Sequence, residues 1–400
     1  MKAETIPLGS YANVISGFAF KSNDFVDAGV PVLKIANIKH EHVVFDPIQY
    51  LPTSFLSIDN KYHVRNGDVM ICLTGSHLSQ PNSVVGRVAM YRHDRIALLN
   101  QRAGRIIVND EKLDKDYLYY YLRQKDVMYQ LALNAGGSAN QANISPRDVE
   151  KVLLPDIDID HQQAISKCLK KYDDLIGNNN RRISLLEEAA RELYKEWFVR
   201  FRFPGHEHVN IVDGVPEGWH TKPLIDIADL TMGQSPKSEF YNQEGEGLPF
   251  HQGVTNYGFR FVSHETWCTK QTRLAESGDI LFSVRAPVGR LNITLDKMIL
   301  GRGLASMRSK GGCQSFLFYQ LKSVFFKEDM IGGGAIYASV TKKDLENFEL
   351  LVPTNSLLLE FEEFASNIDA QIRTLHLSNQ NLIEARDLLL PKLMSGEIAV

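Results

Sequence analysis

Two blocks of the sequence concentrate cationic side chains with little opposing charge. Residues 84–108 contain five arginines and one acidic residue, Asp94, and residues 285–310 contain six lysines and arginines with Asp296 alone. An arginine guanidinium donates two parallel hydrogen bonds, which suits phosphate oxygens and the edge of guanine, while Asn and Gln amides fit adenine. These residue types favour binding of a nucleic acid.

The candidate nucleic-acid contacts combine the basic blocks with neighbouring amide, hydroxyl and imidazole groups. In the first half of the chain they are Lys21, Ser22, Thr74, Ser76, His77, Gln80, Asn82, Arg87, Arg92, Asn100, Gln101, Arg102 and Arg105. In the second half they are Lys237, His251, Gln252, Asn256, Tyr257, Ser283, Arg285, Arg290 and Arg302. For any one residue a solvated surface position is an equal alternative, but two matched blocks favour binding.

Motifs that would indicate catalysis or a metal site are absent from the sequence. It contains no GxxxxGK[ST] phosphate loop, no GxGxxG after a strand, no HExxH and no GxSxG. His206 and His208 form an HxH, but without partners at ligand spacing they are expected to be solvated loop histidines. The Gly332–Gly334 run lacks the Lys-Ser or Lys-Thr of a phosphate site and predicts a tight turn. We expect no catalytic residue, metal or cofactor in this chain.

The amino-acid composition excludes some classes of protein. Apolar residues make up 44% and charged residues 23%, the formal net charge is −4, and no apolar run approaches the roughly 20 residues that span a bilayer. A nucleic-acid surface must therefore be local. The four cysteines show no CxxC spacing and the N-terminus has no hydrophobic signal, so a reducing cytoplasm is the expected compartment.

The chain repeats itself in order, which predicts two similar domains. Ile6–Ser22 resembles Lys222–Ser238 without a gap: both contain Pro-Leu, a Gly nine residues after that Leu, and a final Lys-Ser. Further matched pairs are Gly29–Ile38 with Gly247–Asn256, Asn66–Leu73 with Ser277–Val284, Val84–Met90 with Pro287–Ile293, Tyr117–Leu122 with Phe316–Leu321, and Gly136–Pro155 with Gly333–Pro353. In the last pair, Ser145 with Asp148 and Thr341 with Asp344 resemble capping boxes that start short helices.

A coiled-coil helix follows each copy, and its apolar residues alternate spacings of four and three. The first seam contains Ile165, Leu169, Tyr172, Ile176, Asn179, Ile183, Leu186, Ala190, Leu193 and Trp197. The second contains Phe361, Ala365, Ile368, Ile372, Leu375, Asn379, Leu382, Arg386, Leu389 and Leu393, each 196 residues after its counterpart. The first helix is predicted over 159–200, about 60 Å at 1.5 Å per residue. Between it and the second copy, Phe203–Trp219 reads as a linker.

Two such helices would expose their seams unless they paired. Connectivity alone leaves parallel and antiparallel pairing open. An antiparallel register placing residue i opposite residue 558 − i sets Asn179 opposite Asn379, and a buried Asn pair disfavours slipped registers. The equal alternative is that each Asn lies in a solvated stretch, such as the run Asn178–Asn180.

In this order, several segments resemble the DNA specificity subunits of type I restriction-modification systems, over nearly the whole chain. They are the PL…G…KS opening, GDVMICLTGS (67–76), LLNQRAGRI (98–106), LLPDIDIDHQQAI (153–165), LYKEWFVRF (193–201), VPEGW (215–219) and RDLLLPKLMSGEI (386–398). The second copy departs from the pattern, because Gly301–Gly303 reads GRG where the first copy has the NQR of Asn100–Arg102.

The resemblance implies an α+β fold: two globular mixed α/β target recognition domains, separated by two long helices paired as an antiparallel coiled coil, with an internal pseudo-two-fold repeat. We expect domain 1 at 1–156, the central helix at 157–203, the linker and domain 2 at 204–355, and the C-terminal helix at 356–400. Helix pairing is assigned to Ile165, Leu169, Ile176, Asn179, Ile183, Leu186, Leu193, Ile368, Ile372, Leu375, Asn379, Leu382 and Leu389.

The family implies a non-catalytic subunit whose domains each read half of a split site in double-stranded DNA. Its helices would set the spacer and dock DNA methyltransferase subunits, probably two, with restriction subunits completing the complex. S-adenosylmethionine, ATP and magnesium would belong to those partners. Acidic residues on the helices would repel DNA and suit a protein partner, although solvation is their commoner role: Glu187, Glu188, Glu192, Glu196, Glu360, Glu362 and Glu363. The alternatives are a self-contained enzyme that modifies or cuts DNA, and a coiled-coil adaptor without DNA function.

Overall fold

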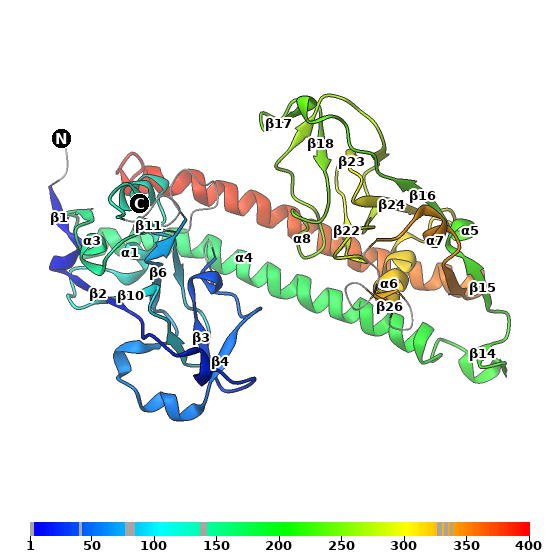
Figure 1. Ribbon diagram of the computed structural model, residues 1–400, viewed down its shortest axis with the longest axis horizontal. Coiled ribbons are helices and arrows are strands. Elements are labelled where there is room, and N and C mark those ends of the chain that lie inside the picture. Colours follow the sequence, from blue (N-terminus) through cyan, green and yellow to red (C-terminus); the bar gives the residue numbers. More distant parts are fainter. Residues whose placement is uncertain are drawn as a thin grey trace. The chain divides into compact units, whose positions relative to one another are not determined.

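The computed structural model describes residues 4–39, 42–76, 85–136, 142–325, 330–331, 335–336 and 339–400. The chain forms two compact units, residues 1–178 with 379–400 and residues 179–378. Each unit thus contains one globular domain together with part of both long helices, so the expected boundaries near 157 and 356 fall inside the units (Figure 1). None of the described helices is both long and apolar enough to cross a membrane.

The first domain is built on two four-stranded sheets. The antiparallel sheet has the order β2-β10-β6-β8, formed by Ala12–Ser16, Ala103–Val108, Val69–Cys72 and Val88–Met90. The mixed sheet has the order β4-β3-β9-β5, formed by Gln49–Leu51, Val30–Leu33, Ala97–Leu99 and His63–Val64, with β3 and β9 parallel. Two short ribbons pair β1 (Thr5–Pro7) with β12 (Leu153–Pro155) and β7 (Thr74–Gly75) with β11 (Ala142–Asn143). Its helices are α1 (Lys115–Leu122), α2 (Lys125–Leu133) and α3 (Pro146–Glu150).

The second domain repeats this plan, as its sequence predicts. Its antiparallel sheet β16-β24-β21-β22 is formed by Ala228–Met232, Leu304–Ser309, Ile280–Ser283 and Leu291–Ile293. Its mixed sheet β17-β19-β18-β23-β20 is formed by Tyr241–Asn242, Trp267–Cys268, Leu248–His251, Met298–Leu300 and Leu274–Ala275, with β18 and β23 parallel. The remaining strands are β13 (Ile211–Val212), β14 (Val215–Pro216), β15 (His220–Pro223), β25 (Met330–Ile331), β26 (Ala335–Ile336) and β27 (Glu349–Val352), and the helices are α5 (Leu224–Ile227), α6 (Gln314–Val324) and α7 (Lys342–Glu346).

Local chemistry explains where the matched short helices begin. The Ser145 hydroxyl accepts from the N–H of Asp148 (3.3 Å), whose carboxylate accepts from the N–H of Ser145 (3.0 Å). Thr341 and Asp344 make the same reciprocal pair, at 3.3 and 2.9 Å. Both predicted capping boxes are confirmed, and each satisfies helix N–H groups that would otherwise lack a partner.

The two long helices are α4 (Ile159–Tyr194), which continues as a π-helical turn over Lys195–Val199, and α8 (Asn355–Met394). In the first unit, Ile165 and Leu169 of α4 share the domain's core with Leu390 and Leu393 of α8. This pairing is antiparallel and follows the predicted 558 − i register.

The second unit shows the same register between α4 and α8. Ile183 packs with Ile372 and Leu375, and the Trp197 and Phe361 rings lie 5.8 Å apart between centroids. Within each unit these contacts run in the antiparallel direction, and every seam residue is buried or half-buried, which is consistent with the predicted pairing.

The seam asparagines Asn179 and Asn379 are buried, whereas Asn178 and Asn180 beside the first are exposed. A solvated position therefore does not describe either seam residue. Because Asn179 and Asn379 belong to different units, their facing each other stays a prediction.

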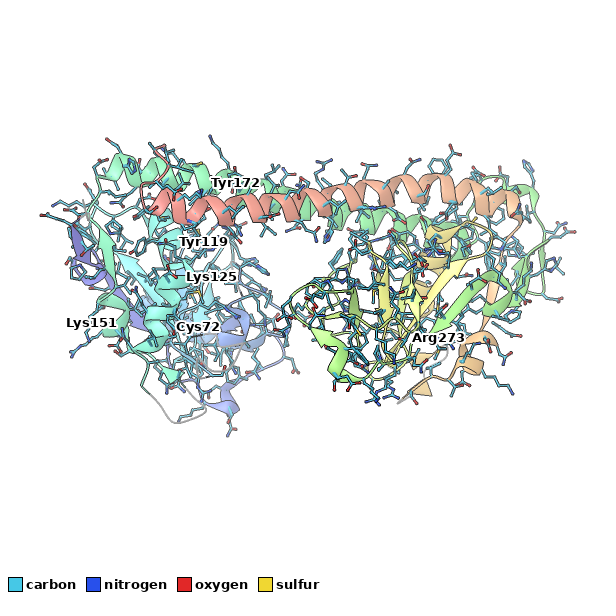
Figure 2. The ribbon with its side chains drawn as sticks, turned by 90° about the horizontal axis from the view of Figure 1, so that it is seen from above. Cys72, Tyr119, Lys125, Lys151, Tyr172 and Arg273 are labelled. Carbon is cyan, nitrogen blue, oxygen red and sulfur yellow. The ribbon has the colours of Figure 1, made fainter. Side chains whose placement is uncertain are left out.

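The predicted linker Phe203–Trp219 is anchored at both ends. Phe203 and Trp219 are buried in the core of the second unit, with ring centroids 5.5 Å apart, and Trp219 also lies 5.8 Å from Phe198. Between them β13 and β14 form a hairpin. Figure 2 shows the side chains that fill the domains, among them the buried Cys72 and Tyr119. The Gly332–Gly334 run lies outside the described residues.

The fully buried Phe361 side chain gives a test of the seam's contribution to stability. Phe361→Ala should lower the unfolding free energy of the second unit by about 3–5 kcal/mol, because it leaves a cavity among packed aromatic rings. Phe364→Ala removes the same side chain from a site that is 52% exposed and should cost about 1 kcal/mol or less. Denaturant unfolding followed by tryptophan fluorescence reports this unit, since Trp197, Trp219 and Trp267 all lie in it. Equal losses in the two variants would contradict the packing described.

Candidate nucleic-acid interface

The Asn100–Arg102 turn lies where several strands of the first domain end. The N–H of Asn100 donates to the carbonyl of Leu33 at the end of β3 (3.0 Å), and the N–H of Gln101 donates to that of Phe18 after β2 (3.0 Å). The carbonyl of Arg102 accepts from the N–H of Leu73 after β6 (3.0 Å). Backbone bonds therefore gather the ends of three strands around one exposed turn.

A glycine allows the strands to close on this turn. A Cβ atom at Gly17 would lie 2.3 Å from the Leu99 carbonyl oxygen and 2.4 Å from that of Asn100. Such contacts are too short for any side chain, so the position requires glycine. Gly233 in the second domain is equally constrained, because a Cβ there would lie 2.1 Å from the Gly301 carbonyl oxygen. The Gly shared by the two sequence repeats therefore has a structural reason.

The Gly301–Gly303 turn of the second domain makes two of the same backbone contacts, and its third contact is to a side chain. The N–H of its first residue donates to the carbonyl of His251 at the end of β18 (2.8 Å), and the carbonyl of its third accepts from the N–H of Val284 after β21 (2.9 Å). The N–H of Arg302 donates to the Ser235 hydroxyl (3.0 Å) after β16. The two turns are equivalent in the backbone although one reads Asn-Gln-Arg and the other Gly-Arg-Gly.

The exposed arginine consequently moves by one position between the domains. Arg302 stands where the first domain has Gln101, and Gly303 stands where it has Arg102. A Cβ at Gly303 would lie 2.4 Å from the Gln252 carbonyl oxygen, so no larger residue fits. The two domains thus present different hydrogen-bonding groups on one scaffold.

We call the groups around each turn the strand-end edge of that domain. In the first domain it comprises Lys21, Ser22, Thr74, Ser76, Asn100, Gln101 and Arg102, which are exposed or half-buried. In the second it comprises Lys237, Gln252, Arg285 and Arg302, which are all exposed. Within each domain these predicted residues belong to the turn or closely follow, along the chain, the strand ends that are bonded to it.

Sequence reasoning missed residues that shape both edges. Phe18 is 39% exposed and packs against Phe20 and Tyr62, with centroids 5.1 and 5.3 Å away. In the second domain, the Ser235 hydroxyl donates to the Gln252 side-chain oxygen (2.8 Å) and accepts from the Arg302 amide. Their places just after the shared Gly17 and Gly233 are the signal that could have identified them.

Other predicted contacts lie inside the domains instead. Ser283 is buried, and its hydroxyl donates to the carbonyl of Pro287 (2.6 Å) and accepts from the N–H of Arg290 (2.8 Å). Arg105 contacts the His63 carbonyl and the Asp68 carboxylate (3.2 Å). These groups stabilise the fold, and we do not assign DNA contacts to them.

Several further candidates are partly enclosed or not described. Arg87, Asn256, Tyr257 and Arg290 are half-buried, and the hydroxyl of Tyr257 is buried. Arg92 is bonded to Asp173 of α4 (3.1 Å). His77, Gln80 and Asn82 lie outside the described residues.

His251 is buried, with 3% of its surface exposed, and precedes Gln252 of the strand-end edge of the second domain. Its Nε2 lies 2.8 Å from Nδ1 of His264, whose Nε2 lies 3.1 Å from the Asp296 carboxylate. Burial, and then the neighbouring His264, lower the pKa of His251 to about 4. His251 is therefore a neutral structural residue at pH 7.

Two of the acidic helix residues are also internal, which corrects the expectation that they form a surface repelling DNA. Glu187 is buried and bonded to Arg260 and to Lys322 Nζ (2.7 Å). Glu362 accepts from the N–H groups of Ser315 (3.0 Å) and Phe316 (2.9 Å) at the start of α6. Their charges are used within the second unit.

Metal ligands do not gather in the described part of the chain, where no group of three or more His, Cys, Asp or Glu side chains could hold an ion. His206 and His208 are exposed on a short turn, and His206 Nδ1 lies 2.8 Å from the Phe203 carbonyl. The four cysteines are free, and Cys72, Cys268 and Cys313 are buried.

Comparison with known proteins matches both halves of the chain to one domain. Residues 2–188 and 216–384 match the type I restriction modification DNA specificity domain. The putative type I restriction enzyme MjaX specificity subunit of Methanocaldococcus jannaschii is 30% identical over 384 residues, covering 93% of this chain and 88% of that protein. The MjaIX specificity subunit from the same organism is 26% identical over 357 residues, covering 84% and 81%. The type I restriction-modification S subunit from M. genitalium shares the fold, with a TM-score of 0.57, 17% identity, and coverage of 98% and 96%.

The neutral state of His251 can be measured directly. Its imidazole should stay uncharged from pH 8 down to about 4, in contrast to the ordinary pKa of 6.5. Because the unfolded chain binds this proton at higher pH than the folded chain, stability from His251 should be lost as the pH falls from about 6.5 to about 4. NMR titration of the full chain with ¹³C-labelled histidine tests this, with the signal assigned through its loss in His251→Asn. Protonation of that signal between pH 6 and 7 would contradict the buried geometry.

Proposed function

The chain belongs to the family of type I restriction-modification DNA specificity subunits, and from that premise we propose that each domain reads one half of a bipartite DNA site. It is the specificity component of such a system, not its catalytic one. The reading surface of each domain is its strand-end edge. Both edges present Lys and Arg for phosphates and Arg, Asn or Gln for base edges.

One observation carries this proposal: the two edges share a backbone scaffold but not their side chains. The Asn100–Arg102 and Gly301–Gly303 turns contact equivalent strand ends, yet the exposed arginine is displaced by one residue. Donors placed differently on one scaffold fit different base edges. Two unlike half-sites are therefore the expected target, and a symmetric palindrome is not.

The long helices have a separate role in the proposed function. α4 follows the first domain and α8 follows the second, and within each unit the two helices pair in a fixed register. We assign them the setting of the spacer between half-sites and the docking of DNA methyltransferase subunits, to which restriction subunits would be added. S-adenosylmethionine, ATP and magnesium would be bound by those partners.

Reading by the edge predicts a local loss of specificity when its arginine is removed. Arg102→Ala should reduce discrimination at one or two positions of a single half-site by about ten- to a hundredfold and leave the other half-site unchanged. Selection from a random duplex library by the full chain, assembled with its methyltransferase subunits, gives the motif of each variant.

Lys151→Ala is the matched control for this loss of a positive charge. Lys151 has a side chain that is 77% exposed, and it lies by the opposite end of β2, where the N–H of Leu8 donates to the carbonyl of Val152 (2.8 Å). Its motif should match that of the unmodified chain. An unaltered motif for Arg102→Ala, or equal changes in both variants, would exclude the first edge as a reading surface.

Spacing by the helices predicts a separate response. Seven residues inserted in α4 between Asn178 and Asn179, and seven in α8 between Ser378 and Asn379, lengthen each helix by about 10 Å. The spacer between half-sites should then lengthen by about three base pairs, with both half-sites unchanged. The same library selection measures this, and recovery of the original spacer would contradict the assigned role of the helices.

A further inference from the structure

A carboxylate on each long helix is bonded to a tyrosine of the domain that precedes that helix. In the first unit, the Tyr120 hydroxyl on α1 donates to Asp173 on α4 (2.8 Å). In the second, the Tyr319 hydroxyl on α6 donates to Asp369 on α8 (2.9 Å). Tyr120 and Tyr319 are matched in the sequence repeat, and Asp369 follows Asp173 by the 196 residues that separate the two helix seams. The contact is thus repeated at corresponding positions.

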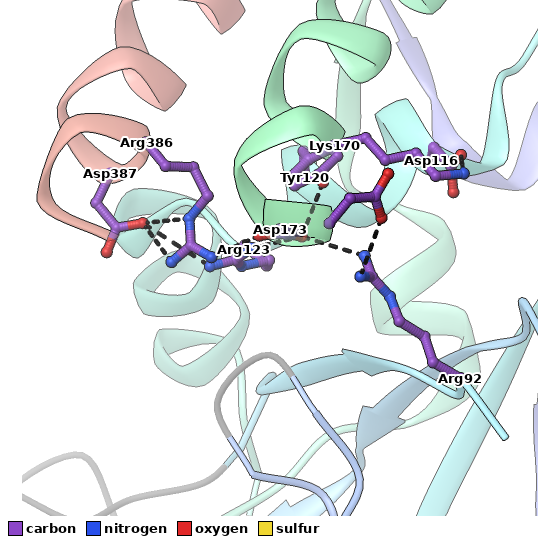
Figure 3. A network of polar contacts seen from close by, with 9 residues as sticks. Arg92, Asp116, Tyr120, Arg123, Lys170, Asp173, Arg386 and Asp387 are labelled. Carbon is purple, nitrogen blue, oxygen red and sulfur yellow. Dashed lines mark hydrogen bonds and ion pairs between the residues drawn. The ribbon is translucent and has the colours of Figure 1, made fainter. Parts of the chain in front are cut away.

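In the first unit, Asp173 joins three parts of the structure (Figure 3). Its side chain is 7% exposed and lies 2.6 Å from Nη1 of Arg386, a seam residue of α8 that is almost fully buried. Nη2 of Arg92, next to β8, lies 3.1 Å away, and Nη1 of Arg123 at the end of α1 lies 3.9 Å away. One buried carboxylate therefore holds the domain, α4 and α8 together.

In the second unit, an arginine from the domain joins the domain to both helices through a different set of contacts. Arg260 is buried, and its guanidinium lies 2.5 Å from Asp369 of α8 and contacts Glu187 of α4. Lys322, at the position matching Arg123, bonds to Glu187 (2.7 Å). Burial alone would raise the pKa of Glu187, but Arg260 and Lys322 outweigh it and hold that pKa below its ordinary value.

Charged contacts constrain orientation more than the apolar seam does. Hydrophobic burial is non-directional, so packed leucines and isoleucines tolerate small shifts and rotations. A buried carboxylate displaced from its partners is left uncompensated, which is strongly unfavourable. Each domain is therefore fixed on the helices of its own unit by groups that oppose sliding and swivelling.

We propose that these two groups, the carboxylate clamps formed around Asp173 with Tyr120 and around Asp369 with Tyr319, decide how strictly the protein rejects DNA sites with a wrong spacer. The proposal rests on the proposed bipartite reading. Neighbouring base pairs differ by about 3.4 Å in position and about 35° in rotation. Both domains can therefore bind a site whose spacer is one base pair too long or too short only if one domain shifts and rotates by that much. The clamp residues are positioning residues and touch no DNA.

Removing a single hydroxyl tests this with little change to the core. The full chain assembled with its methyltransferase subunits is assayed on duplexes carrying the selected motif with its natural spacer, or with one base pair more or fewer. Tyr120→Phe and Tyr319→Phe should each raise binding to the wrong spacers relative to the natural one by about tenfold, since each loses a hydrogen bond to a charged group. The bases preferred in both half-sites should stay the same.

Tyr121→Phe is the matched control, because its hydroxyl donates to the carbonyl of Leu153 (2.7 Å) within the domain and does not reach a helix carboxylate. Its spacer preference should equal that of the unmodified chain. Unchanged spacer ratios in both Tyr120→Phe and Tyr319→Phe would overturn the proposal, as would an equal loss of binding at every spacer. Failure of the bipartite reading itself would appear separately, as an unmodified chain that binds all spacers equally.

Discussion

The two antiparallel helices α4 and α8 bury an apolar seam that also forms part of the core of each domain. Neither α4 nor α8 could keep its apolar face in water alone, and both pack into the cores of the domains beside them. Ile165, Leu169, Leu390 and Leu393 belong to the core of the first unit, so that domain and the helices are stabilised together. The register of the seam then places Asp173 beside Arg386, and Trp197 beside Phe361.

Duplication explains how one architecture serves two recognition surfaces. The sheets of the two domains share their central strand order, and equivalent glycines, Gly17 and Gly233, allow equivalent turns to close. The residues that the turns display differ, because one turn reads Asn-Gln-Arg and the other Gly-Arg-Gly. Different residues displayed at the same strand ends can change the target without refolding the core.

Much of this architecture could be predicted from the sequence because it rests on local or periodic signals. Seam spacing and the Ser145 and Thr341 capping boxes depend on residues a few positions apart, and the repeated segments are found by comparing the chain with itself. Which charged residues form ion pairs inside the fold could not be predicted from such signals. Arg92 and Arg105 sit in a basic block, yet the fold places carboxylates from distant segments, Asp173 and Asp68, beside them. Glu187 looked like a surface residue because its partner Arg260 is 73 positions away.

The sequence repeat aligns the two turns, but their residues do not predict that the turns make equivalent contacts. Asn-Gln-Arg and Gly-Arg-Gly share no residue at any of the three positions, and the backbone bonds to Leu33 and His251 show that the contacts correspond. Arg386 is the one charged residue of the predicted seams, and an arginine in an apolar seam requires a buried acidic partner. The sequence could therefore have predicted a buried carboxylate near it.

The proposed role of this chain is to select, by itself, a bipartite DNA site for modification. Sequencing of modified bases in genomic DNA tests it most directly, using cells that carry the methyltransferase subunits with and without this chain. A motif of two unlike half-sites separated by a fixed unread spacer should be modified only when the chain is expressed. The same motif without the chain, or a continuous or palindromic one with it, would exclude this role.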